Sequence, residues 1–511
     1  MMSKFLFFVF ILFFCQSNQA FAQYDSVWAC GPYSSIMDFR QKDTLVSPLM
    51  AFSDLYLYTV LSLSSFYYPK DTVLFISNGV DITNTKRQDA ENDDLLVDPI
   101  FKQRYRAGIS AINSTLLLPR DSISFYSINR SGDGAYVDPF NNLIGNITYY
   151  GVVAIRDSFK SKVVQAKISL KDENILPASS FLTATRHANG RDFWIVEKAW
   201  KGNTYFVYRT SPDTIVLAHT QTIGDSTGEW DTYGGGVFSP QGDRLVFTCA
   251  TQYAQLFDFD RCTGLLSNPL KLLTPAFDRL GDTIYSSIDT PFGGLFASFS
   301  PSGRFLYYNT LWRIEQYDLS SGIHDSIIAS RYVVDKWDSA FLTQYRTYEP
   351  FDISLIGINN KIYMSLFSPA DLARLHVIND PDSAGAKCNY VRGGFKLGIE
   401  NISGSPLPNV PYYSLKVQAD SPCDTIGKVE PPKPLPVVFS LYPNPTKGSF
   451  ATASPVGGVL KMYDAMGKLV GSMEIIAGTQ QHRIDLSAGV YVVKVDLADR
   501  RETGRLVVIN Q

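Results

Sequence analysis

Short apolar stretches alternate with turn-forming residues through most of the chain, and one such pattern occurs twice in nearly the same form. Residues Phe238–Phe247 hold a Ser-Pro-Gln-Gly turn followed by an apolar strand, and Gln255–Asp260 supply a second strand rich in aromatic residues. Sixty-one residues later, Phe299–Tyr308 and Ile314–Leu319 repeat this order. Proline and glycine after serine favour a tight turn, and alternating apolar residues favour a strand. The unit therefore predicts a turn that leads into two neighbouring strands.

Weaker copies of the unit extend the pattern in both directions. Its turn positions, Gly190, Gly242, Gly303 and Asn360, lie 52, 61 and 57 residues apart. A repeat of this length, made of short strands without a helical period, is typical of the four-stranded blades of a β-propeller. The stretch 23–417 has room for about seven blades, with six or eight left open. An array of β-sandwiches is the alternative, although a sandwich of about 100 residues does not explain a period near 57.

Composition agrees with an all-β protein and narrows the range of partners. Aromatic residues make up 13% of the chain, with 29 Tyr and 33 Phe, which favours strands over helices. The 46 Lys and Arg nearly balance 49 Asp and Glu, and this argues against a nucleic-acid partner. After residue 22 no apolar run approaches the roughly 20 residues that a membrane-spanning helix needs. We expect a soluble mature protein.

The N-terminus has the three parts of a secretion signal. Lys4 gives the positive start, Phe5–Cys15 form an apolar stretch, and small residues flank Phe21 at the end of the segment. This arrangement predicts a signal peptide over residues 1–22, cleaved between Ala22 and Gln23. The protein should therefore leave the cytoplasm.

Export changes how the cysteines are interpreted, because disulfides persist outside the cytoplasm. Five cysteines remain after cleavage: Cys30, Cys249, Cys262, Cys388 and Cys423. An odd number leaves at least one of them unpaired. Cys249 and Cys262 fall near opposite ends of a predicted hairpin, about 20 Å apart, which is too far for a bridge. We expect these two not to pair, and the remaining pairings stay open.

A catalytic or metal site needs clustered donor groups, and the sequence shows no such cluster. The histidines are widely separated: His187, His219, His324, His376 and His482. No zinc-protease, serine-hydrolase, nucleotide-loop or paired-cysteine motif occurs. We therefore assign no catalytic residue, no cofactor and no metal ligand. Because propeller enzymes can build a site from single residues on several blades, an enzyme remains an alternative.

His187 is the strongest single candidate for chemistry, because Asp192 and Trp194 follow it closely. Asn189 and Gly190 stand between them, however, and Asn-Gly before alternating apolar residues is typical of a turn that enters a strand. We expect a structural role for His187.

Exposed Tyr and Trp side chains would suit a glycan-binding surface, although most strand aromatics should fill the gaps between blades.

A proline-rich segment, Glu430–Pro436, separates the repeats from a different pattern near the C-terminus. Proline runs of this kind form extended, semi-rigid spacers. Beyond it, short alternating strands bounded by glycine and asparagine predict a small β-sandwich. The expected organisation is a signal peptide at 1–22, a β-propeller at 23–417, a linker at 418–437 and an Ig-like β-sandwich at 438–511.

The C-terminal segment resembles the type A sorting domain of the bacterial type IX secretion system. Three ordered motifs carry the resemblance: a Tyr-Pro-Asn-Pro opening, a central Asp with Gly-Lys, and an Asp-Leu-Ser-x-Gly-x-Tyr close. The matching residues are Tyr442, Pro443, Asn444, Pro445, Gly448, Asp464, Gly467, Lys468, Asp485, Leu486, Gly489 and Tyr491. The region before it is similar to the WD40-like propellers that precede such domains, through residues 186–194, 256–264 and 375–382.

The resemblance implies a destination for the protein. The sorting domain would be recognised by the type IX outer-membrane machinery, so the protein would pass through the periplasm to the cell surface or the medium. We expect the propeller to act there as a binding or interaction module, for a glycan or a protein. Two alternatives remain, a secreted propeller enzyme such as a polysaccharide hydrolase or lyase, and a structural or adhesion component of the surface layer.

Overall fold

The computed structural model describes residues 24–30, 35–40, 44–48, 63–68, 73–86, 88–104, 113–131, 147–156, 160–170, 181–228, 234–249, 253–273, 296–310, 312–345, 351–366, 374–397, 407–418, 421–423, 440–454, 457–476, 478–497 and 501–509. The chain divides into two compact units, Met1–Asp424 and Thr425–Gln511. The predicted signal peptide, with its cleavage site at Ala22 and Gln23, lies outside the described residues and stays a prediction. Among the described helices, none has the length and apolar character needed to cross a membrane.

The described part of the first unit forms seven antiparallel sheets, and in each of them strands adjacent in sequence pair with one another. Two sheets have three strands: β1 (Val27–Cys30), β2 (Ser35–Asp38) and β3 (Leu45–Pro48), then β4 (Ser64–Tyr68), β5 (Val73–Ser77) and β6 (Ile82–Asn84). Two four-stranded sheets follow: β7 (Thr115–Asp121), β8 (Ser124–Ser131), β9 (Ile147–Arg156) and β10 (Lys160–Ser169), then β11 (Thr183–Arg186), β12 (Phe193–Lys198), β13 (Gly202–Thr210) and β14 (Ile215–Thr227).

Three more four-stranded sheets complete the series. They are β15 (Gly234–Phe238), β16 (Arg244–Cys249), β17 (Tyr253–Phe259) and β18 (Leu266–Leu273); β19 (Phe296–Phe299), β20 (Phe305–Thr310), β21 (Arg313–Asp318) and β22 (Tyr332–Lys336); and β23 (Ser354–Ile356), β24 (Ile362–Met364), β25 (Arg374–Ile378) and β26 (Tyr390–Lys396). Short helices lie between strands: η1 (Asp93–Leu95), α1 (Pro99–Arg104), α2 (His324–Ala329), α3 (Ser339–Tyr345) and η2 (Gly385–Cys388).

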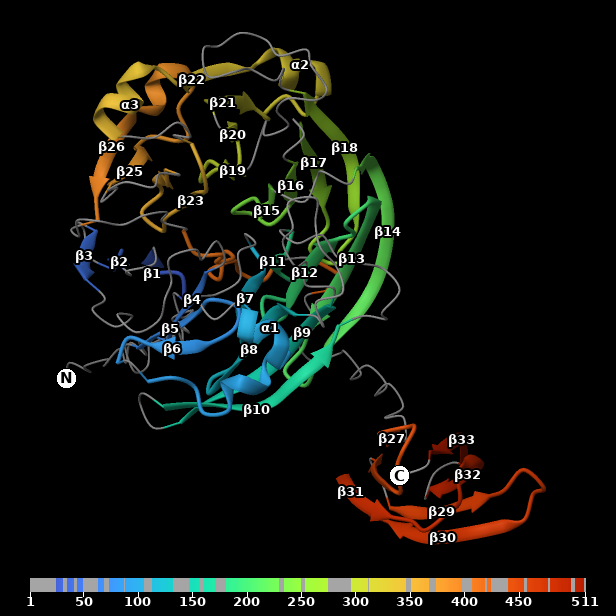
Figure 1. Ribbon diagram of the computed structural model, residues 1–511. Helices are drawn as coiled ribbons and strands as arrows, with labels where there is room; N and C mark the ends of the chain where they lie inside the picture. The colour runs from blue at the N-terminus through green and yellow to red at the C-terminus, as the bar shows by residue number, and fades with distance from the viewer. Residues whose placement is uncertain are drawn as a thin grey trace, which may run out of the picture. The chain divides into compact units, whose positions relative to one another are not determined.

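The seven sheets are arranged as a ring. The first strands of successive sheets contact each other, as β1 does with β4, β4 with β7, β11 with β15, β15 with β19 and β19 with β23. One apolar cluster joins Trp28 and Met37 of the first sheet to Tyr363 and Val377 of the last, which closes the ring. In Figure 1 these first strands lie around a common centre, with β10, β14 and β18 outside them. The described residues of the unit form a β-propeller of seven blades, and the predicted fold class is confirmed.

The repeated turn connects the first and second strands of a blade. In the fifth blade Ser239 accepts a hydrogen bond from the Gly242 amide (2.8 Å) and, through its hydroxyl, one from the Arg244 amide (3.0 Å). In the sixth blade Ser300 accepts the equivalent bonds from Gly303 and Phe305. Both glycines have φ near +70°, a conformation that residues with a Cβ adopt only with strain.

The second unit has two sheets, ordered β27 (Ser440–Tyr442), β28 (Ser449–Ser454), β31 (Gly478–Arg483), and β30 (Leu469–Ile475), β29 (Gly458–Tyr463), β32 (Gly489–Leu497), β33 (Arg501–Val508). Along β32 the side chains of Tyr491, Val493 and Val495 are buried, and those between them are more exposed. They share a core with Phe450 of the other sheet. This is a small β-sandwich of the Ig-like kind that the sequence predicts.

Candidate functional site

Residues 407–418 and 421–423, which we call the strap, follow the last blade and return to the centre of the propeller. The side-chain amide of Asn409 donates hydrogen bonds to the carbonyl oxygens of Thr115 and Leu182, both at 3.0 Å. Thr115 begins β7, and Leu182 stands immediately before β11. One side chain of the strap therefore ties two blades together where their first strands start.

Tyr413 anchors the strap deeper in the ring. Its side chain is fully buried, and its hydroxyl donates a hydrogen bond to the Leu117 carbonyl oxygen of β7 at 2.5 Å. The edges of Tyr24, Phe66 and Phe193 surround the ring, with centroid distances of 5.7, 6.1 and 6.1 Å. Edge-to-face packing of this kind adds to the hydrophobic gain from burial, so Tyr413 is part of the core.

Further along, the strap reaches the opposite end of the first strands. The Gln418 amide donates to the Ala188 carbonyl oxygen (2.9 Å), and Ala188 follows the end of β11. The Asn409 amide, in contrast, donates to the Leu63 carbonyl oxygen, just before β4 begins. The strap thus passes through the centre of the ring, alongside the whole of β11.

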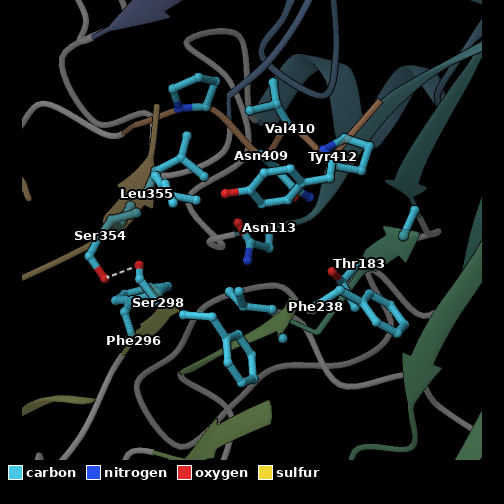
Figure 2. A pocket seen from close by; sticks show the side chains of 18 of the residues that line it. Asn113, Thr183, Phe238, Phe296, Ser298, Ser354, Leu355, Asn409, Val410 and Tyr412 are labelled. Atoms are coloured by element: carbon cyan, nitrogen blue, oxygen red, sulfur yellow. Dashed lines mark hydrogen bonds between the residues drawn. The ribbon is translucent and has the colours of Figure 1, made fainter. Parts of the chain in front are cut away.

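A small cavity of about 50 Å³ remains beside the strap. Figure 2 shows Val410 and Tyr412 of the strap on one side of it, with Phe238 and Ser298 on the other. The lining side chains are apolar or uncharged polar groups, and Ser298 donates to the Ser354 hydroxyl at 2.7 Å. A space of this size admits a few water molecules, whereas pockets for small molecules measure about 300–1,000 Å³.

A disulfide holds the end of the strap to the fifth blade. Cys423 pairs with Cys262, which lies in the turn between β17 and β18. Cys30, Cys249 and Cys388 are buried and form no disulfide with a described residue. The prediction that Cys249 and Cys262 do not pair is confirmed, as is that of at least one unpaired cysteine. The observed pair could not be found from the sequence, because its members stand 161 residues apart.

Two buried arginines lie where the strap leaves the ring. Arg261 donates through Nε to the Arg186 carbonyl oxygen (2.9 Å) and through Nη2 to the Lys416 carbonyl oxygen of the strap (2.8 Å). Arg186 donates through Nη1 to the Gly190 carbonyl oxygen at 2.8 Å. Burial lowers the pKa of both arginines, and it raises the pKa of the neighbouring Asp25 to about 6. Arg186 and Arg261 fall within the stretches that resemble WD40-like propellers, but the sequence assigned no functional role to any of these three residues.

One ring nitrogen of His187 is hydrogen-bonded within its own turn. Its Nδ1 accepts a hydrogen bond from the Asn189 amide at 2.9 Å, and the Asn189 side chain donates to Asp192 at 2.9 Å. The imidazole packs against Trp194, with ring centroids 5.0 Å apart. Burial lowers the pKa of His187 to about 4, so the ring is neutral near pH 7. These contacts give His187 a structural role.

In the second unit, the opening motif is bonded to the last strand. The Asn444 side chain donates to the Arg505 carbonyl oxygen (2.7 Å) and accepts from the Val507 amide (2.8 Å). Pro443 and Pro445 flank it, each after a cis peptide bond. The side chain of Tyr442, in contrast, is partly exposed.

The other motif residues mostly form turns. Asp464 accepts hydrogen bonds from the amides of Met466 and Lys468, both at 2.9 Å, and Gly467 has a φ of 79°. Tyr491 donates to the Ser487 carbonyl oxygen at 2.8 Å. The remaining positions are Gly448, with a φ of 102°, the exposed Asp485, Leu486 beside the core, and Gly489 at the start of β32.

The family of this unit follows from its sequence. Residues 440–509 match the secretion system C-terminal sorting domain. A sorting domain of the type IX system indicates that the protein is secreted, to the cell surface or the medium, and that it interacts with the type IX machinery. No curated protein matches the chain.

Several solved structures are similar to this chain at low sequence identity. A periplasmic gluconolactonase of Pseudomonas aeruginosa is 15% identical over 76% of this chain and 100% of its own, with a TM-score of 0.45. A putative 6-phosphogluconolactonase of Bacteroides uniformis is 11% identical over 75% and 99%, with a TM-score of 0.41. The β-propeller domain of Myceliophteria thermophila Cps50 (Swd1) is 10% identical over 67% and 91%, with a TM-score of 0.34. Likeness at this level says nothing about activity.

Proposed function

We propose that the protein is a secreted binding or interaction module, in which the sorting domain provides delivery and the outer surface of the propeller provides recognition. One observation carries the proposal: beside Val410 and Tyr412 the strap leaves a cavity of only about 50 Å³, lined by uncharged groups. A larger cavity of about 700 Å³, with Asp243, Asp260 and Arg261 in its lining, lies at the outer end of the strap beside Gln418 and Ser421. A propeller enzyme would need an open funnel with acid, base or cationic groups facing a substrate. A glycan or a protein at the cell surface is the partner that we favour.

The order of the parts completes the proposal. Residues 1–22 take the chain across the inner membrane and are removed between Ala22 and Gln23. The propeller at 23–417 and the linker at 418–437 then cross the periplasm with the sorting domain at 438–511. The twelve motif positions of that domain, from Tyr442 to Tyr491, maintain the fold that the machinery recognises, since most of them make turn or strand contacts inside the domain.

The test uses the mature chain, residues 23–511, on glycan and peptide arrays with parallel turnover assays on polysaccharides and sugar lactones. We expect binding without turnover. Turnover in proportion to protein concentration would establish the enzyme alternative. Loss of this turnover on substitution of the buried Arg186 would strengthen that conclusion. Ordered self-assembly of the purified protein, without binding on either array, would favour the structural alternative.

A further inference from the structure

One face of the sorting domain carries apolar side chains that its core does not use. In β32 the side chains of Tyr491 and Val493 are buried in the sandwich. Because side chains alternate along a strand, Val490 and Val492 lie on the outer face of the sheet. Val490 is 54% exposed and Val492 37%. Each of them leaves apolar surface in contact with water, which costs free energy unless a partner covers it.

These exposed residues have apolar neighbours across the sheet. Tyr463 of β29 stands directly opposite Val492 of β32 and opposite Leu469 of β30. Leu469 is 49% exposed, and Met466, in the turn between β29 and β30, is 91% exposed. Side chains opposite each other on one face of a sheet lie about 4.5–5.5 Å apart, so they form a continuous surface. We call Tyr463, Leu469, Val490 and Val492 the outer patch.

Basic side chains border the outer patch. Lys494 follows Val492 on the same face, and its Nζ lies 5.2 Å from the centroid of the Tyr463 ring. Arg505 of β33 stands opposite Val492, and Lys468 belongs to the turn between β29 and β30. Among the described residues of this unit, none is an ion-pair partner of these three bases. We call Lys468, Lys494 and Arg505 the basic border.

The acidic groups of this face do not neutralise the basic border. Asp496 pairs with Lys461 and Arg501 at the opposite end of the sheet, where the exposed Glu474 also lies. Asp464 is nearer, and its carboxylate accepts hydrogen bonds from two amides of its own turn. Three bases against this single carboxylate leave a net positive charge around an apolar centre.

We propose that the outer patch and the basic border are the surface through which the sorting domain docks on the type IX machinery. This inference rests on the proposed function, in which the sorting domain provides delivery. The matching surface of the machinery is apolar at its centre and acidic around it. Contact between the apolar centres excludes water, and the opposite charges set the orientation of the two proteins.

The machinery suits this surface better than a second copy of the chain does. The match of residues 440–509 to the sorting-domain family already indicates that this unit interacts with the machinery. Two copies in contact through the outer patch would bring their basic borders close together, and like charges across an interface oppose binding. Of the twelve motif positions only Lys468 belongs to this surface. The motif therefore marks the scaffold of the domain, whereas most of the docking contacts come from residues outside it.

The first measurement compares the export rates of full-length variants in cells that contain the type IX system. Pulse-chase labelling follows the appearance of the protein outside the cell. We expect Leu469→Gln combined with Val492→Thr to slow export about tenfold, because apolar contacts with the machinery are lost. Ile476→Gln is the matched control, since Ile476 is 63% exposed and directly follows the other end of β30. It should leave the export rate unchanged.

The second measurement reverses one charge on each sheet of the domain. Lys494→Glu should slow export about threefold, because a charge at the rim of an interface mainly changes the rate of association. Arg483→Glu should leave export unchanged, since Arg483 is an exposed base in β31 of the other sheet. Hydrogen exchange in β32 of the purified mature proteins should match the wild type, which shows that the domain is folded. Wild-type export of L469Q/V492T and of K494E would contradict the proposal.

A chain that ends at residue 437 separates this inference from the proposed function. If it is exported as well as the full chain, delivery by the sorting domain is wrong. If it is retained while L469Q/V492T and K494E leave the cell normally, only the docking surface is wrong. Ultracentrifugation of the mature protein tests a second copy, and co-sedimentation with phosphatidylglycerol vesicles tests a membrane. Dimers or vesicle binding that L469Q/V492T abolishes would assign the outer patch to that partner and contradict the proposal.

Discussion

The two units of this protein differ in how far along the chain their defining contacts reach. In the sorting domain, Asp464 bonds to Met466 and Lys468, so its turn is specified within five residues, and the longer motif bonds of Asn444 span 61 and 63 residues. In the propeller, Asn409 bonds to carbonyl groups 294 and 227 residues away. Local contacts leave a motif that the sequence shows directly, whereas the contacts of the strap leave none. Single changes to the two units should therefore differ in their effects on export and on stability.

Removal of the sorting domain should have the largest effect, since this unit carries the address of the protein. A chain that ends at residue 437 should accumulate in the periplasm and be nearly absent from the cell surface and the medium. Cell fractionation and immunoblotting measure this, with the full chain as the control. The purified truncated protein should keep the thermal transition of the propeller. Unchanged export would contradict the assignment of the address to this unit.

Asn409→Ala should destabilise the propeller strongly for a single substitution. It removes both side-chain hydrogen bonds to Thr115 and Leu182 and leaves their carbonyl groups unpaired in the interior. We expect the free energy of unfolding of the propeller to fall by about 2–3 kcal/mol. Urea denaturation measures it, and Asn203→Ala, which removes one half-buried side-chain bond to Gly224, is the matched control. Equal effects of the two variants would mean that the strap does not support the ring.

His187 should make the stability of the propeller depend on pH. Its folded pKa of about 4 lies below its ordinary value of 6.5, so the unfolded chain takes up the proton first as the pH falls. Its contribution to stability is complete above pH 6.5 and is lost towards pH 4, by up to about 2 kcal/mol at pH 5.

His187→Asn keeps an acceptor for the Asn189 amide and removes the titration. Thermal melts at pH 7 and pH 5 should show a smaller loss of stability in this variant than in the wild type. Asp25, whose raised pKa acts in the opposite direction, is present in both proteins and cancels in the difference. Parallel pH profiles would contradict burial of a neutral imidazole.

Asp464→Ala should have the smallest effect, restricted to the sorting domain. It removes two hydrogen bonds at an exposed turn and should cost about 1 kcal/mol there, while the propeller keeps its stability. Hydrogen exchange in β29 and β30 measures the loss. Asp485→Ala is the matched control, because Asp485 is an exposed motif carboxylate. If D485A impaired export without faster exchange, the machinery would read that side chain directly.

The sequence allowed the fold to be predicted where turn chemistry is local. Ser239 with Gly242, and Ser300 with Gly303, form the same hydrogen-bonded turn, and their spacing led to the seven-bladed propeller. The first two sheets show only weak copies of the unit, and each has three strands in the described residues. The alternation of buried and exposed residues in β32 likewise predicted the sandwich.

The centre of the propeller could not be predicted. Its lining comes from the first strands of several blades and from the strap, and no short stretch of sequence holds more than a few of these residues. Asn409 stands in Leu-Pro-Asn-Val-Pro, which looks like an ordinary loop. Arg261 meets Arg186 across two blades, and Cys423 reaches Cys262 because the chain returns through the ring. Local periodicity does not record either contact.

The position of the disulfide also determines how the protein responds to mechanical tension. Cys423 is the last described residue of the strap, and its bond leads into the turn between β17 and β18. A pull on the C-terminal unit, by an export machine or by flow past an anchored cell, therefore passes through the covalent bond into the fifth blade. Asn409 and Tyr413 precede this bond in the chain, so the disulfide takes up tension from the C-terminal side before it reaches them.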